Sequence, residues 1–385
     1  MKARRFRFSV LGMFWLAADV GAQAQLPGYG HAASGMGGAS IALPYDSAAS
    51  ANNPAGMAFV GSRADILFTT AFIDATTGLG PSQYKASDLG LAPTGGINWD
   101  LQNGWTVGMS IFGFGSGTDY EQPLPGNTTD THSSIAQVVL APTLTYRVAS
   151  NQAIGFALLV AAQRLEIGGL QSFGFEDAGP DSSYGAGVSI GYLGELAPGL
   201  MIGLTYSSRI NMGKLDKYKQ LLADGGNQDI PQQAGIGLSW RATPQLTAAF
   251  DYLWINWSSV KPLGNAFPGN GPPGSPDGPG FGWKDQSIYR FGIAYDANDQ
   301  WTLRTGATYK TKLIVPEYAT LNTLAALVPQ VTLTLGATYK IDGRHIVSAA
   351  YAHNFQKTVI GTQASAGVTL TSSANFLTVG YGYQF

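Results

Sequence analysis

The residues whose types could do chemistry are few, and their spacing does not suit it. The four histidines share no metal-ligand spacing: His31, His132, His345 and His353. No cysteine occurs among the 385 residues, which excludes disulfides, iron–sulfur clusters and thiolate zinc sites. Two strings fit a hydrolase or a dinucleotide-binding pattern, GVSIG at 187–191 and GYGHAA at 28–33, but neither lies at the strand-to-helix turn that its pattern requires. The sequence therefore predicts no enzyme, no metal and no cofactor.

The composition instead indicates a chain with an unusually apolar surface. Hydrophobic residues make up 45% of the chain and charged residues only 12%, with 51 glycines. Soluble domains usually carry about 25% charged residues, so water would solvate this surface poorly. The net charge is −2 and no basic patch occurs, which excludes nucleic acid as a partner.

The N-terminus predicts export. Four cations, Lys2, Arg4, Arg5 and Arg7, precede an apolar run at 8–18, and the small residues of AQA at 22–24 follow it. This pattern is typical of a secretory signal peptide, predicted at 1–24. No later segment offers the roughly 18 apolar residues of a membrane-spanning helix, so any spanning must use strands.

Fourteen runs from residue 63 onward alternate between apolar and polar side chains and are bounded by turn residues. Their approximate spans are 63–73, 93–101, 104–115, 134–147, 152–166, 182–194, 199–210, 232–242, 245–257, 285–296, 300–312, 329–340, 343–355 and 373–385. In the twelfth run, Val331, Leu333 and Leu335 share one face while Thr332 and Thr334 share the other, as a strand between lipid and a polar lumen requires.

The connections between these runs alternate in length. Six short turns contain, in order, Gln102-Asn103, Ala149-Ser150, Ala197-Pro198, Thr243-Pro244, Asn298-Asp299 and Asp342, and the connections between them run from about a dozen to nearly thirty residues. Short turns, long loops and an even strand count predict an all-β fold, a 14-stranded antiparallel transmembrane β-barrel in the outer membrane of a Gram-negative bacterium, with both termini in the periplasm. A soluble β-sandwich is the alternative, but it does not account for the alternation or the low charge.

Residues 25–61 precede the first strand and lack its alternation. They are rich in small residues, which allow close backbone packing, so we expect this segment to fold into the lumen as a plug, here called the hatch. The chain is thus predicted to comprise a signal peptide at 1–24, the hatch at 25–61 and the barrel at 62–385.

The third predicted strand ends in glycines at alternate positions, Gly113, Gly115 and Gly117. Glycine weakens a strand and permits a bulge or kink, so a gap in the wall is expected here. The alternative is a turn that leads into the next loop. Phe112 and Phe114 lie beside the glycines and would suit a hydrophobic ligand.

These features together resemble the FadL/TodX family of outer-membrane transporters for long-chain fatty acids and aromatic hydrocarbons. The resemblance rests on the glycine-broken third strand, the fourteen strands, the C-terminal Phe385 and, most specifically, the hatch. The hatch residues that carry it are Gly35, Gly37, Gly38, Asn52, Asn53, Pro54 and Ala55. It implies that the hatch plugs the barrel and that Gly113, Gly115 and Gly117 form a lateral gate, although family members usually carry an Asn-Gly-Gly-type run there.

Two of the longer connections carry apolar residues at helical spacing. Leu215, Tyr218 and Leu222 form one such set, and Tyr318, Leu321 and Leu324 form another. They are candidate ligand contacts in an outer groove, or else they pack onto the barrel rim. Five cations are expected to face the lumen and are candidates for holding a carboxylate: Arg147, Arg290, Arg304, Lys310 and Lys340.

The predicted function is passive, ligand-gated import of a hydrophobic small molecule by capture at the outer loops, hatch movement and lateral exit. A general hydrophilic porin and a barrel enzyme such as a lipase are the alternatives. The expected partners are the hydrophobic substrate, membrane lipid and lipopolysaccharide, and the outer-membrane insertion machinery acting through Phe385; a monomer is expected. The sequence alone leaves open whether the substrate is a fatty acid or a hydrocarbon.

Overall fold

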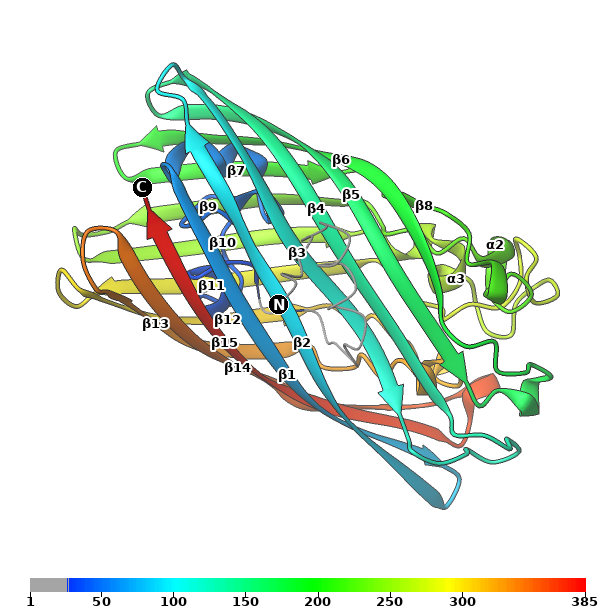
Figure 1. Cartoon of the computed structure of the whole chain (residues 1–385). Coiled ribbons are helices and arrows are strands. Elements are labelled where there is room, and N and C mark those ends of the chain that lie inside the picture. The colour runs from blue at the N-terminus through cyan, green and yellow to red at the C-terminus, as the bar shows by residue number, and fades with distance from the viewer. Residues whose placement is uncertain (1–25, 27) are drawn as a thin grey trace, which may run out of the picture.

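The computed structural model describes Leu26 and residues 28–385, so the predicted signal peptide lies outside the described residues. The chain forms one antiparallel sheet that closes on itself, because consecutive strands pair throughout, β1 pairs with β15, and β5 pairs with β6 (Figure 1). The strands are β1 (Arg63–Leu79), β2 (Ser82–Asp100), β3 (Trp105–Asp119), β4 (His132–Ala149), β5 (Gln152–Gly168), β6 (Asp181–Ala197), β7 (Leu200–Ser207), β8 (Asn211–Met212), β9 (Gln233–Arg241), β10 (Leu246–Ile255), β11 (Gln286–Asp296), β12 (Trp301–Lys310), β13 (Val331–Lys340), β14 (His345–Ile360) and β15 (Val368–Gln384). Because β7 and β8 both pair with β6 and are separated only by residues 208–210, they are two parts of one strand, and the predicted 14-stranded barrel is confirmed.

The alternation of each strand places apolar side chains outward. In β13, Leu333 is 49% and Leu335 61% exposed, whereas Thr332 and Thr334 are buried toward the lumen. In β15 and at the residue after it, Leu377, Val379, Tyr381 and Phe385 are likewise exposed. The outer face therefore suits hydrocarbon, and the inner face is polar or small.

The six predicted short turns lie at the end of the barrel where the chain terminus of β15 is found. Two of the predicted long connections are wrong. β1 and β2 continue well beyond their predicted ends and are joined only by Gly80 and Pro81, because Thr- and Gly-rich residues with weak alternation still pair across the hairpin. The β14–β15 connection, at 361–367, is also short for the same reason.

Helices are short throughout the described residues. The elements are η1 (Ala33–Gly35), η2 (Ala49–Ala51), η3 (Pro54–Phe59), η4 (Gln171–Phe173), η5 (Asp216–Tyr218), α2 (Ala223–Gly226), η6 (Trp257–Ser259), α3 (Lys261–Gly264), η7 (Pro316–Tyr318), η8 (Leu321–Leu324) and η9 (Gln363–Ser365). None of the described helices is long and apolar enough to cross a membrane. Of the helix-spaced loop residues, Tyr218, Tyr318, Leu321 and Leu324 lie on short 3-10 turns, and Leu215 and Leu222 lie just before such short elements. Isolated helices of this length gain too few hydrogen bonds to persist.

The long loops pack together into a cap over one end of the barrel. Its apolar core joins β5 to four loops and includes Leu215, Tyr218, Trp283 and Leu324. The cap and the hatch lie toward opposite ends of the barrel (Figure 1).

Candidate functional site

The described part of the hatch, Leu26 and 28–61, lies inside the barrel and contacts strands all round its circumference (Figure 1). The Gly37 amide donates to Thr334 Oγ1 at 2.8 Å, and Thr308 Oγ1 donates to the Gly37 carbonyl at 2.6 Å. On another side, the Ser40 amide donates to Asp251 at 2.7 Å. The wall thus supplies partners for hatch backbone groups that no regular secondary structure satisfies.

The hatch glycines permit this close approach. Gly37 has φ +63°, and a Cβ there would meet the Ala307 backbone at 2.6 Å. A Cβ on Gly35 would lie 3.0 Å from the Cα of Gly336 on β13. Gly38 has φ +85°, which L side chains rarely adopt.

The Asn-Pro-Ala triplet forms the start of η3 and ties it to the wall. The Asn53 side chain accepts from the Ala55 amide at 3.1 Å and donates to the carbonyls of Ile41 and Tyr192, which lies on β6. Pro54 occupies the first turn, where its missing N–H costs nothing. Asn52 donates to the Tyr29 carbonyl at 2.8 Å, so this residue holds two parts of the hatch together.

A buried charged cluster, here called the lock, joins the hatch to β1. Asp65 accepts two hydrogen bonds from Arg63, at 2.6 and 2.8 Å, and one from the Ser47 amide at 2.8 Å. His31 Nε2 lies 3.3 Å from Asp65, and the His31 amide donates to Asp46 at 2.5 Å. Burial raises the pKa of Asp46, against the smaller opposing effect of His31. A charge network out of contact with water is strongly destabilised when one member is removed.

The lock also brings a serine, a histidine and an aspartate together, which sequence spacing did not reveal. His31 Nδ1 is hydrogen-bonded to Ser348 on β14, while its Nε2 faces Asp65. The side chains of His31 and Asp65 are 0% exposed, and Gly30 and Gly380 pack against the cluster. A hydrolytic site needs space for a reacting group beside the nucleophile, so this arrangement fits a structural role in holding the hatch.

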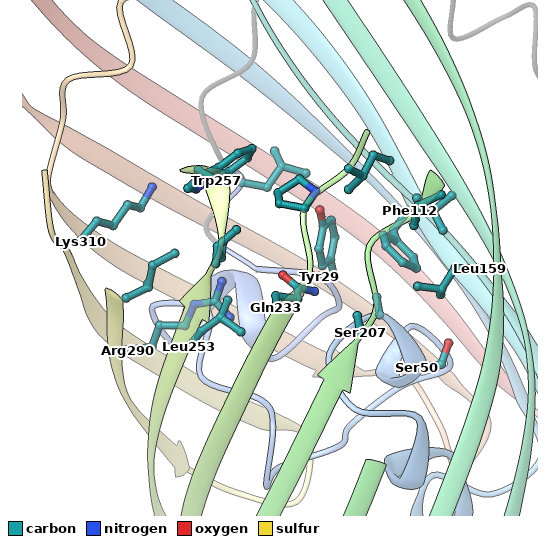
Figure 2. Close-up of a pocket in the computed structure, with 18 of the residues that line it drawn as sticks. Tyr29, Ser50, Phe112, Leu159, Ser207, Gln233, Leu253, Trp257, Arg290 and Lys310 are labelled. Carbon is teal, nitrogen blue, oxygen red and sulfur yellow. The ribbon is translucent and has the colours of Figure 1, made fainter. Parts of the chain in front are cut away.

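Above the hatch, the lumen contains a cavity of about 1070 Å³, including the part open to solvent. Most of its lining is apolar, from Leu26 and Ala51 in the hatch to Phe112 and Leu159 in the wall. Figure 2 shows Tyr29 of the hatch between Phe112 and Leu159 on one side and the cations Arg290 and Lys310 on the other.

The two lumen cations differ in their partners. Arg290 donates to the Gly38 carbonyl at 3.3 Å and is attracted by Asp251. Lys310 lines the cavity, and the positive charge of Arg290 repels it. Among the other predicted lumen cations, Arg147 and Arg304 stack on hatch rings, whereas Lys340 is exposed at the end of β13 and does not line the cavity.

The wall has a seam between β2 and β3. Their ladder covers only six pairs and ends at Gly95 and Ile111, while β3 remains paired with β4 as far as Asp119. Beyond the seam, Tyr120 packs with Ala75 of β1 and Ala86 of β2, whose side chains face inward. The outer end of β3 therefore lies on the inner side of the β1–β2 hairpin, and Figure 1 shows β2 and β3 diverging there.

The three predicted gate glycines all lie beyond the seam. A Cβ on Gly113, Gly115 or Gly117 would collide with a carbonyl oxygen of β4. Phe112 lies at the seam, lines the lumen cavity and contacts Tyr29 at a ring distance of 5.1 Å. The side chain of Phe114 lies outside the described part of the structure.

The predicted loop residues separate into two groups. Leu222, Leu321 and Leu324 line an apolar loop pocket of about 620 Å³ within the cap. Leu222 and Leu324 also belong to the cap core. Leu215 and Tyr218 are buried in that core without lining the pocket, and the Tyr218 hydroxyl donates to the Gly179 carbonyl, as the rim-packing alternative supposes. Tyr318 lies under Lys284, whose Nζ is 5.2 Å from the ring.

Sequence reasoning missed the lock and Tyr29. Arg63 and Asp65 lie two residues apart at the start of β1 and so share its inward face, which is a readable signal for a buried pair. Tyr29 is a single large residue among small ones, which is a weaker sequence signal than the Arg63–Asp65 spacing. The partners of both come from distant strands and could not be read from spacing.

Comparisons with known proteins agree with this architecture. The toluene transporter TodX of P. putida superposes with a TM-score of 0.74 at 18% identity, over 94% of this chain and 99% of that one. A FadL homologue of Pseudomonas aeruginosa gives 0.75 at 18% identity, over 94% and 100%. The toluene transporter TbuX of Ralstonia pickettii gives 0.68 at 18% identity, over 94% and 99%. No curated protein sequence matches the chain.

The sequence comparison extends over almost the whole chain. Residues 15–385 match the family described as outer membrane protein transport protein (OMPP1/FadL/TodX). The members of this family are transport channels. The chain therefore belongs to the OMPP1/FadL/TodX family of outer-membrane transport proteins.

Proposed function

We propose that this protein carries hydrophobic small molecules across the outer membrane by passive, ligand-gated diffusion. The observation that carries the proposal is the apolar lumen cavity, which reaches from the hatch to Phe112 at the seam. A cavity of this composition stabilises each buried methylene by about 0.8 kcal/mol. A hydrophobic solute is thus more stable in the lumen than in the lipopolysaccharide leaflet.

In this scheme the ligand is captured in the loop pocket, enters the lumen and leaves sideways through the seam. Trp105 is an exposed aromatic residue at the periplasmic end of β3, and the seam begins six residue pairs farther along the strand. For a tilted strand, this distance places the seam about 15 Å above Trp105. That height is within a hydrocarbon band about 25 Å tall. The exit would therefore open onto lipid tails.

The hatch controls the exit because it covers Phe112. Tyr29 and Ala51 pack against the cluster that contains Phe112 and Val139. A ligand that binds better when Tyr29 has withdrawn shifts the hatch toward the withdrawn state. Residues 25–61 thus act as the movable unit and 62–385 as the frame.

The cationic side of the cavity favours amphipathic anions within the hydrophobic class. Lys310 offers a cation for a carboxylate at one end, and the apolar lining accepts a chain at the other. A fatty acid fits this polarity better than a neutral hydrocarbon does. The similar structures include both a FadL homologue and toluene transporters, which supports a hydrophobic substrate in general. The binding test with Lys310→Met distinguishes a fatty acid from a neutral hydrocarbon.

Two other functions are less consistent with the lumen. A hydrophilic porin requires an open aqueous path, whereas the hatch fills the bore. A barrel enzyme requires a base that a reacting group can reach, whereas the His31 and Asp65 side chains beside Ser348 are fully buried. The same proposal has the protein act as a monomer surrounded by lipid and lipopolysaccharide. The insertion machinery of the outer membrane recognises Phe385, whose amide donates to the Ser62 carbonyl at the barrel end.

Replacing Asp65 with asparagine is expected to loosen the hatch and raise ion conductance. The change removes the charge that pairs with Arg63 and His31, and breaking a buried pair costs about 3–5 kcal/mol. Planar bilayer recordings should show large steps for D65N and almost none for the parent. The matched control is D342N in an exposed turn. Large steps in the parent itself would instead support the porin function.

Replacing Gly115 with alanine is expected to lower uptake of hydrophobic solutes about tenfold. The new Cβ meets the Ile135 carbonyl, so β3 must move off β4 and lose its inward course, and overpacking of this kind costs about 1–3 kcal/mol. Uptake of labelled oleate by whole cells measures the effect. The control is Gly343→Ala, where a Cβ meets nothing within 4 Å. Undiminished uptake by a folded G115A barrel would count against exit at the seam.

A further inference from the structure

One loop segment lies between the loop pocket and the seam. Residues 321–329, which run from η8 toward β13, are here called the partition. Leu321 and Leu324 at its start line the loop pocket. Ala326, Leu327 and Pro329 at its end line a second space, the seam pocket, of about 330 Å³ including the part open to solvent. The same nine residues thus form part of the wall of both pockets.

The seam pocket adjoins the displaced end of β3. Its other walls include Gly117 and Thr118 of β3 and Ile73 and Ala75 of β1. These β3 residues lie beyond the last pair between β2 and β3. A solute in the seam pocket would therefore already be next to the seam, without entering the larger lumen cavity.

Three hydroxyl groups from three different places on the wall hold the partition by its backbone. Tyr120, just after β3, donates to the Thr323 carbonyl at 2.7 Å. Ser133 on β4 donates to the Leu324 carbonyl, and Ser372 on β15 donates to the Ala326 carbonyl at 2.5 Å. Burial raises the pKa of Tyr120 to about 12, so its hydroxyl keeps the proton that it donates. Thr77 of β1 contacts the same hydroxyl at 2.6 Å and fixes its direction.

The ends of the partition are anchored independently of these hydroxyls. Asn322 accepts from the Trp283 indole at 2.7 Å and donates to the Phe281 carbonyl at 2.7 Å. At the other end the chain enters the β13 ladder at Val331. Between these ends the segment is held by the three hydroxyl groups and by apolar packing of Leu324, Ala325 and Val328 in the cap core, so loss of a hydroxyl removes one of several contacts that keep it in place.

We propose that the partition is a movable wall, and that its release joins the loop pocket to the seam pocket and gives small neutral apolar solutes a short path to the bilayer. The proposal rests on the proposed function, since it uses the same outer capture and the same lateral exit. It differs in that this path does not require the hatch to move. Longer amphipathic ligands need the larger lumen cavity and its cations, so the two paths sort solutes by length and charge.

The test uses intact cells in which the hatch path is closed. Ser50 of the hatch and Ser110 of β3 have their Oγ atoms 2.6 Å apart, so Ser50→Cys with Ser110→Cys forms a disulfide between hatch and wall. In this oxidised background, Tyr120→Phe and Ser372→Ala each remove one hydroxyl of the partition. Entry of the neutral dye N-phenyl-1-naphthylamine is followed by its fluorescence, and each variant is expected to increase the rate about fivefold, the effect of one typical hydrogen bond.

The matched control is Ser365→Ala. Ser365 is also a buried serine whose hydroxyl donates to a carbonyl of the same loop, but that carbonyl belongs to Glu317, outside the partition. An unchanged dye rate in both folded variants, or an equal rise in the control, would overturn the proposal. Labelled oleate is measured in the same cells: oleate uptake that ignores the disulfide contradicts hatch gating in the proposed function, whatever the dye does.

Discussion

A disulfide between the hatch and β3 is expected to abolish uptake of long-chain fatty acid, and a reducing agent is expected to restore it. Ser50 and Ser110 are both buried, and their hydroxyls touch at 2.6 Å, close to the separation of two bonded sulfurs, about 2.0 Å. Ser110 also donates to the Ser47 carbonyl, so this part of the hatch already rests on β3. A covalent link there holds Tyr29 and Ala51 over Phe112.

The chain suits this experiment because it contains no cysteine of its own. The two single variants serve as controls, since each carries the same local change without the bond. Uptake of labelled oleate by whole cells, with and without reductant, is the measurement. Oxidised protein that transports as fast as reduced protein would show that the hatch does not gate this path.

Replacing Lys310 with methionine is expected to weaken binding of a fatty acid by about 30-fold and to leave its methyl ester unaffected. A hydrogen bond to a charged group contributes roughly 1.5–3 kcal/mol, which the ester cannot gain. Methionine keeps most of the side-chain volume, so the apolar lining is preserved. Quenching of Trp257, which lines the same cavity, reports both affinities.

Lys340→Met provides the matched control, because this lysine is exposed at the end of β13 and away from the cavity. Equal losses for acid and ester would mean that Lys310 acts through packing. Loss for neither would remove the reason to prefer fatty acids over hydrocarbons. Removal of Arg290 would instead leave Asp251, which holds two hatch amides, without its cation.

The barrel could be predicted because it depends on local pattern. Alternation such as Val331 to Leu335 has the strand period, and a closed sheet is the way such strands satisfy their backbone groups in lipid. The alternating turns then gave the strand count. Connection lengths were less predictable where polar strands continue beyond the membrane, as in the β1–β2 hairpin, because their alternation no longer reflects a difference between lipid and lumen.

The candidate site was predictable only in part. The glycines of the hatch and of β3 were identified because a missing side chain is visible in sequence, and the structure shows what fills the space, such as the Ala307 backbone against Gly37. Leu215 and Leu324 have the same helical spacing and chemistry as ligand contacts would. Both are buried in the cap core and Leu324 also lines the loop pocket, because the strands and loops that surround them come from separate parts of the chain.

The amino-acid sequence by itself determined the class of fold, the membrane as its solvent, the strand count and the position of the hatch, since all of these follow from short-range periodicity and composition. Only the tertiary structure decided how the hatch is held, where the seam begins and which cations face the cavity. Asp65 meets His31 and Ser47, and Tyr120 meets Thr323, through barrel closure, which sets distant residues side by side in a way that no local pattern encodes.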